Sequence, residues 1–148
     1  MMACTGQASA AVDGPFAQFA GNWSGGGTIT VQNGSRERIR CRGRYVAGRP
    51  ASTISLSLRC ASDSYRFELQ SEIQSEGGRI SGSWNELSRQ IYGQIGGRVT
   101  SNHIDAQAAA VGFNATLSLT IRGNRQEVAI RSPGSEISEV LISLTRGR

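Results

Sequence analysis

Polar and apolar residues alternate along most of the chain after residue 20, and short turn-forming pairs interrupt this alternation. Successive side chains of a β-strand point to opposite faces of a sheet, so a period of two predicts strands with one buried face. The clearest turn pairs are Ser101-Asn102, Val111-Gly112 and Gly123-Asn124. Because such pairs connect antiparallel neighbours, the pattern predicts a meander in which each strand pairs with the next.

A meander must hide its two edge strands, and closure into a barrel does so at the lowest cost. The sequence therefore predicts an all-β fold, a single antiparallel up-and-down β-barrel of about 8 to 10 strands at residues 15–148. Residues 15–20 carry the one short helical pattern, so we expect a short N-terminal helix before the first strand.

The turns also predict which residues face one another, since a slip of one residue would turn a strand inside out. Centring the loop at residues 47–51 sets Cys41 opposite Cys60. We expect these cysteines to form a disulfide, which would place the protein in an oxidising compartment such as the bacterial periplasm. The alternative is a pair of reduced, buried cysteines.

The first residues resemble the remnant of an export signal. Ala8-Ser9-Ala10 has the small-x-small form of a signal-peptidase site, although no apolar segment precedes it. Cys4 also fits a lipoprotein cleavage box and is a candidate for a lipid anchor. No apolar run approaches the ~18 residues of a membrane helix. We expect residues 1–14 to be a residual signal or flexible segment of an exported protein.

Gly21 and Trp23 open the first predicted strand, and Arg146 lies on the last one. This Gly-x-Trp resembles the signature of the calycin superfamily, which comprises lipocalins, fatty-acid-binding proteins and avidins. The resemblance implies that the tryptophan packs across one end of the barrel, with a late arginine, here Arg146, over it. It carries no ligand across, because Gly21 and Trp23 are its only motif positions. One departure is that only a tight turn fits where fatty-acid-binding proteins insert two helices. A small periplasmic metalloprotease inhibitor with a barrel of this kind is a further look-alike.

The inward face of the predicted barrel is rich in large apolar side chains. Its candidates for lining a ligand cavity are Trp23, Tyr45, Leu56, Phe67, Trp84, Ala106 and Leu117. Small residues lie among the large ones, namely Gly82, Gly93, Gly97, Ala106 and Ala108. They either leave room for an apolar ligand or let the walls of the barrel meet in a packed core. Of these two outcomes, the packed core is favoured.

The chain has a net charge of +5, and all 16 of its Lys and Arg residues are arginine. Arginines at strand spacing predict a basic outer face, which a two-residue turn at Ser62-Asp63 would extend by setting Arg59 opposite Arg66. The candidate anion-binding residues are Arg38, Arg40, Arg42, Arg44, Arg59 and Arg66. Lipid headgroups, lipopolysaccharide or an acidic polysaccharide are the expected partners, and nucleic acid is not, because aromatic stacking residues are absent from this face. The alternative is a solvated face that keeps strands apart.

Residues suited to catalysis are few. His103, the one histidine, shares a face with Asp105, but no serine or cysteine has the context of an activated nucleophile. One histidine without clustered carboxylates also argues against a metal site. We therefore expect neither an enzyme nor a cofactor.

The sequence favours a lipocalin-like binding protein of the cell envelope, for a lipid or other apolar ligand or for an anionic surface. A periplasmic protease inhibitor is the first alternative, and it predicts that residues 13–19 project from the barrel. A structural envelope protein without a ligand is the second. The oligomeric state stays open.

Overall fold

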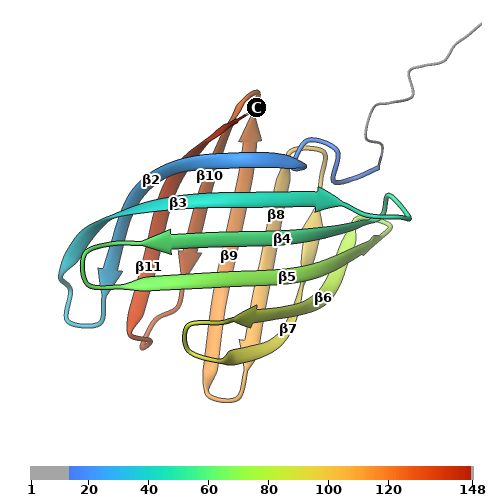
Figure 1. Cartoon of the computed structure of the whole chain (residues 1–148). Coiled ribbons are helices and arrows are strands. Elements are labelled where there is room, and N and C mark those ends of the chain that lie inside the picture. The colour runs from blue at the N-terminus through green and yellow to red at the C-terminus, as the bar shows by residue number, and fades with distance from the viewer. Residues whose placement is uncertain (1–13, 148) are drawn as a thin grey trace, which may run out of the picture.

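The computed structural model describes residues 14–147, which form a closed barrel of ten antiparallel strands (Figure 1). The strands follow one another around the barrel in chain order, and the last pairs with the first. Their bounds are β2 Gly21–Val31, β3 Arg36–Ala47, β4 Thr53–Ala61, β5 Arg66–Glu76, β6 Arg79–Glu86, β7 Ile91–Val99, β8 His103–Ala110, β9 Phe113–Arg122, β10 Arg125–Arg131 and β11 Ile137–Arg146. The predicted all-β meander is confirmed.

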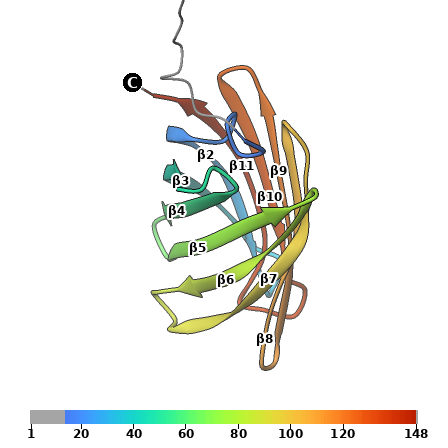
Figure 2. The ribbon, with the colours of Figure 1, turned by 90° about the vertical axis from the view of Figure 1, so that its right-hand side faces the viewer.

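Closure requires the strands to bend around the core. In Figure 1, β3 to β5 run across the view, and β8 to β11 cross behind them at a steep angle. Figure 2 shows the two groups as facing layers. Strand β2 bends from one layer to the other, where Gly27 faces Ile142 of β11. A Cβ on Gly27 would collide with the Leu141 carbonyl, so this tight approach requires glycine.

The predicted N-terminal helix is wrong. Residues 15–19 form turns instead. Separately, no helix within residues 14–147 is long and apolar enough to cross a membrane. So short a stretch gains too few backbone hydrogen bonds to hold a helix, and tertiary packing decides its path. Phe16 and Phe19 are fully buried against the end of the barrel. The predicted signal remnant and Cys4 lie outside the described residues.

Several predicted registers are confirmed. Cys41 faces Cys60 across β3 and β4, and the predicted disulfide is present. Arg98 faces Asp105, as the turn at residues 101–102 predicts. In both hairpins the observed alignment agrees with the prediction.

Other registers are displaced by two residues. Arg59 faces Glu68 rather than Arg66, because the turn between β4 and β5 holds four residues, 62–65, instead of two. The Ser62 N–H donates to the Tyr65 carbonyl, which stabilises this wider turn. A register shift of two residues keeps every side chain on its predicted face. The same residues therefore point into the core, while their cross-strand partners change.

The first hairpin differs in the same way. The alternation of the sequence predicts a three-residue loop at residues 33–35, which would set Ile29 opposite Ile39. The observed loop lies one residue earlier, since the Val31 N–H donates to the Ser35 carbonyl. Ile29 consequently faces Glu37, whereas the prediction paired it with Ile39. Ile29 is still fully buried.

Candidate functional site

The barrel has two unlike ends, each formed by alternate hairpin connections. The closed end carries residues 14–20 and the connections at residues 48–52, 77–78, 100–102 and 123–124. The open end carries the connections at residues 32–35, 62–65, 87–90, 111–112 and 132–136.

Aromatic side chains fill the closed end. The Trp23 indole N–H donates to the Phe19 carbonyl over 2.9 Å, and both rings are buried. The Arg146 guanidinium carbon lies 4.3 Å from the centre of the Trp23 ring, and its N–H groups donate to the carbonyls of Gln18 and Ala20. The predicted packing of Arg146 over Trp23 is confirmed.

This packing bears on the inhibitor alternative. A protease inhibitor of the predicted kind would project residues 13–19 away from the barrel. Phe16 and Phe19 are instead buried, which holds the described part of this segment, residues 14–19, against the closed end. Asp13 lies outside the described residues.

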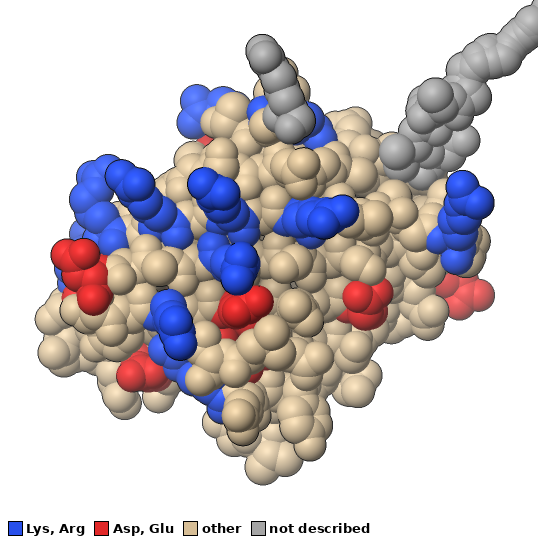
Figure 3. Space-filling model, viewed as in Figure 1, with Lys and Arg blue, Asp and Glu red and all other residues tan. Residues whose placement is uncertain are grey.

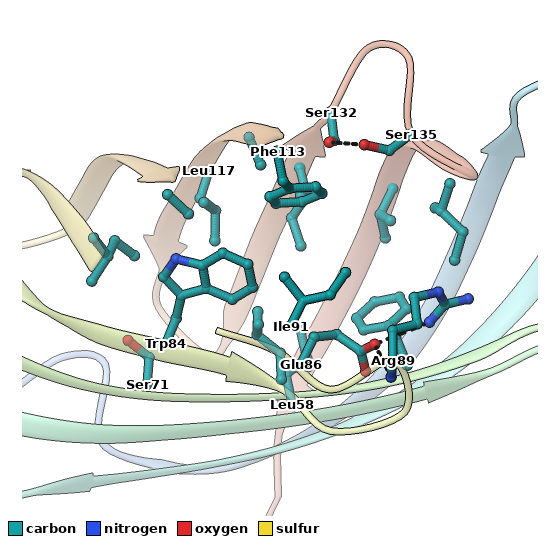
Figure 4. Close-up of a pocket in the computed structure, with 18 of the residues that line it drawn as sticks. Leu58, Ser71, Trp84, Glu86, Arg89, Ile91, Phe113, Leu117, Ser132 and Ser135 are labelled. Carbon is teal, nitrogen blue, oxygen red and sulfur yellow. Dashed lines mark hydrogen bonds and ion pairs between the residues drawn. The ribbon is translucent and has the colours of Figure 1, made fainter. Parts of the chain in front are cut away.

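An apolar cavity of about 350 Å³ occupies the interior and opens at the other end (Figure 4). Of the predicted lining residues, Tyr45, Leu56, Phe67, Trp84 and Leu117 line it. Two predicted residues lie elsewhere in the core: Trp23 plugs the closed end, and Ala106 is buried but does not line the cavity. The packed core that the sequence favoured is therefore wrong.

The room comes from alanine rather than from glycine. Ala108 and Ala115 face each other across β8 and β9, and both line the cavity. A Cβ on Gly82 would instead collide with the Glu72 carbonyl, so this glycine serves the close approach of two strands. Sequence reasoning grouped these small residues together because it could not see how near the strands come.

A polar pair lies deep in the barrel, beside the closed end. The Tyr45 hydroxyl donates to Gln126 Oε1 over 3.0 Å, and Gln126 is fully buried. Burial raises the pKa of the Tyr45 phenol, and the hydrogen bond to Gln126 offsets only part of this rise. The phenol is neutral at ordinary pH, so the deep part of the cavity offers hydrogen bonding without charge.

The mouth of the cavity is charged. Arg89 Nε lies 2.9 Å from Glu136 Oε1, and Arg89 Nη1 lies 3.2 Å from Glu86 Oε1. We call these three side chains the Arg89 bridge; it connects the loop at residues 87–90 with that at residues 132–136. Figure 4 shows the contact between Arg89 and Glu86. Burial lowers the pKa of Arg89, but the hydrogen bonds to Glu136 and Glu86 outweigh it and leave the pKa raised. Arg89 therefore stays charged.

Glu86 has a second task at the mouth. Its carboxylate accepts hydrogen bonds from the backbone N–H groups of Glu68, Ser88 and Arg89, at 2.8, 3.0 and 2.9 Å. It thereby fixes the loop at residues 87–90. Ser132 and Ser135 form the opposite lip, with their hydroxyl oxygens 2.6 Å apart. An apolar interior thus ends in a polar rim.

Sequence reasoning missed most of this rim. Arg89 and Glu136 are 47 residues apart, and neither lies in a strand whose alternation could orient its side chain. Phe113, whose ring centre lies 5.4 Å from that of Trp84, was also missed.

The predicted basic residues lie on the outer surface. Arg38, Arg40, Arg42 and Arg44 are exposed on the outer face of β3. The space-filling view shows a row of basic side chains over this part of the barrel (Figure 3). Arg42 faces Arg59, as predicted, but Arg59 pairs with Glu68 at 3.6 Å. Arg66 faces Ala61, so the predicted sideways row of three arginines ends at Arg59.

The histidine is held in a strand pair. His103 Nδ1 lies 2.9 Å from the Thr120 hydroxyl oxygen, and Asp105 faces Arg98. Within residues 14–147, no three His, Cys, Asp or Glu side chains gather as a metal site would require. The charged groups nearest to the cavity are those of the Arg89 bridge.

Comparisons with known proteins bear on the fold. No family model and no curated protein matches the chain. Among solved structures, the chain is similar to the S-type phycobiliprotein lyase from Guillardia theta, with a TM-score of 0.57 and 10% identity over 90% of each chain. At this identity the likeness shows the fold alone.

The same likeness corrects one expectation. We expected a protein that is not an enzyme, because the sequence carries one histidine and no serine or cysteine in the context of an activated nucleophile. A protein named a lyase has a similar barrel, and this finding contradicts the expectation. A fold hosts many functions, so the absence of a familiar triad was too narrow a ground.

Proposed function

We propose that the protein binds a small, elongated apolar ligand inside its barrel, with the ligand's polar end at the open mouth. The observation that carries this proposal is the apolar cavity of about 350 Å³. Its size falls in the range of about 300–1,000 Å³ that is usual for small-molecule sites. Binding is the step that a carrier and an enzyme acting on its ligand share, so the proposal holds for both.

The polarity of the lining defines the ligand class. Leu56, Phe67 and Trp84 are among the side chains that surround the ligand, and transfer of a charge into such surroundings is costly. Charged and hydroxyl groups lie at the rim, where Arg89 and Ser135 meet solvent. A lipid-like molecule with an apolar tail and one polar end matches both parts.

The disulfide supports a location for this activity. Cys41 and Cys60 are bonded in the structure, and disulfides persist in oxidising compartments. We propose that the protein acts in the bacterial periplasm or elsewhere in the cell envelope, where apolar molecules need carriers through water.

A pair of variants at adjacent residues tests the cavity. Ala108 points into the cavity, whereas Ala109 is exposed on the outer face of the same strand. Ala108→Leu should fill part of the cavity and weaken binding of the neutral fluorescent probe N-phenyl-1-naphthylamine by about tenfold or more, and Ala109→Leu should leave it unchanged. Probe titration by fluorescence and thermal melting of each variant are the measurements.

Two results would contradict the proposal. Absence of saturable probe binding by the wild type would favour a structural protein without a ligand. Equal binding by Ala108→Leu and Ala109→Leu, with both variants folded, would place the probe outside the barrel.

A further inference from the structure

We infer that the outer face of β3 is a docking site for a linear acidic polysaccharide. The site consists of Arg38, Arg40, Arg42 and Arg44, which we call the arginine row. This inference does not depend on the proposed function, because the row lies outside the barrel and the cavity inside it.

The arginine row is regular and uncompensated. Alternate residues of a strand lie about 6.8 Å apart, so the four Cα atoms span about 20 Å. All four side chains are exposed. Within residues 14–147, the arginines that form ion pairs are Arg59, Arg89, Arg125 and Arg131. No arginine of the row forms an ion pair with a carboxylate of these residues.

Small residues of β2 leave a bare strip beside the row. Arg42 faces Ser24, Arg40 faces Gly26 and Arg38 faces Thr28. A Cβ on Gly26 would collide with the Ile39 carbonyl, so no side chain can occupy this position without moving the strands. The strip is therefore a fixed property of the barrel.

The surface around the strip is concave. Residues 24–27 of β2 line its hollow, together with three members of the row, Arg38, Arg40 and Arg42. Arg59 and Arg66 also line it, and so do three acidic residues, Glu37, Asp63 and Glu68, of which Glu68 pairs with Arg59. A chain lying along β3 would meet the four guanidinium groups of the row, three of which line this hollow.

The arrangement favours a linear polyanion over a membrane. A bilayer is flat and would touch only the crest of a barrel, whereas the arginines stand in single file along one strand (Figure 3). The guanidinium group binds sulfate and carboxylate in two-pronged geometry, and both groups occur on acidic polysaccharides.

Nucleic acid fits this face less well. Single-stranded nucleic acid is bound by stacking of its bases on aromatic rings. Within the described part of the chain, the outward positions of β2 to β5 carry no Phe, Tyr or Trp. A polysaccharide needs no such rings for its charged groups.

The test compares two double charge reversals on the full chain. Arg40→Glu with Arg42→Glu alters the row, and Arg79→Glu with Arg98→Glu makes the same change in net charge at two exposed arginines that face each other on β6 and β7. Binding of size-defined heparin fragments is measured by calorimetry at fixed salt, and thermal melting checks each fold. We expect the row variant to lose about tenfold or more in affinity and the control less than about threefold.

Fragment length gives a second readout. A linear site predicts that affinity rises with length until the fragment covers the row, about 20 Å, and that salt weakens the longer fragments more. Equal losses in both variants, or affinity independent of length, would overturn the inference. Tighter binding to phosphatidylglycerol vesicles or to single-stranded DNA than to heparin, lost in the row variant, would overturn it in favour of a membrane or a nucleic acid.

Discussion

The two ends of the barrel differ in how the interior is separated from solvent. At the closed end, Trp23 and two phenylalanines fill the opening, and Arg146 covers them. At the open end, short loops leave the interior accessible, and Arg89 spans the mouth through ion pairs. Burial of apolar side chains contributes far more to the free energy of unfolding than an exposed ion pair does. We therefore expect the closed end to contribute more to stability and the open end to control the access of a ligand to the cavity.

The largest expected effect is at the closed end. Trp23→Ala removes a ring that is 2% exposed and should lower the free energy of unfolding by about 3–5 kcal/mol. Phe113→Ala, at the partly exposed open end, should cost less than half as much. Urea denaturation measures both, and equal losses would remove the distinction between the ends.

Alkaline pH should act on the closed end through Tyr45. Since burial raises its pKa, the folded protein keeps this proton to higher pH than the unfolded chain, whose tyrosines titrate near pH ~10. The stability that Tyr45 contributes is present below that pH and is lost as the pH rises above it. Tyr45→Phe should therefore flatten the fall in unfolding free energy between neutral and alkaline pH. Tyr92→Phe, at a ring that is 73% exposed, should keep the wild-type slope.

The smallest expected effect is on access at the open end. Glu136→Gln weakens the Arg89 bridge and should change the free energy of unfolding by less than about 1 kcal/mol, while the release of N-phenyl-1-naphthylamine becomes about two- to fivefold faster. Glu139→Gln removes an ion pair with Arg131 that lies outside the mouth and is the matched control. Stopped-flow fluorescence measures release, and identical rates in the two variants would show that the bridge does not limit access.

The sequence predicted which face of the sheet each side chain occupies better than it predicted the cross-strand partners. Burial of one side of each strand dictates which residues point inward, and Tyr45, Leu56 and Leu117 line the interior as expected. Cross-strand partners depend on turn length, which Ser62 and its neighbours determine by local hydrogen bonds. No alternation pattern encodes those bonds, so several registers moved by two residues.

The walls and the rim of the candidate site also differ in how well the sequence predicts them. Its walls could be predicted, because strand residues such as Phe67 and Trp84 obey the alternation. Its rim could not, because Arg89 and Glu136 come together only after two loops have been placed. The cavity itself also escaped prediction, since its volume depends on how far apart the walls stand.

The pairing of β2 with β11 has a consequence for synthesis. Arg146 faces Trp23, so the contact that closes the barrel joins nearly the whole length of the described chain. A ribosome delivers β11 last, and until then β2 presents an unpaired edge to other nascent chains. Such distant pairing slows folding. The protein should therefore depend on whatever shields its first strand before the last one is made.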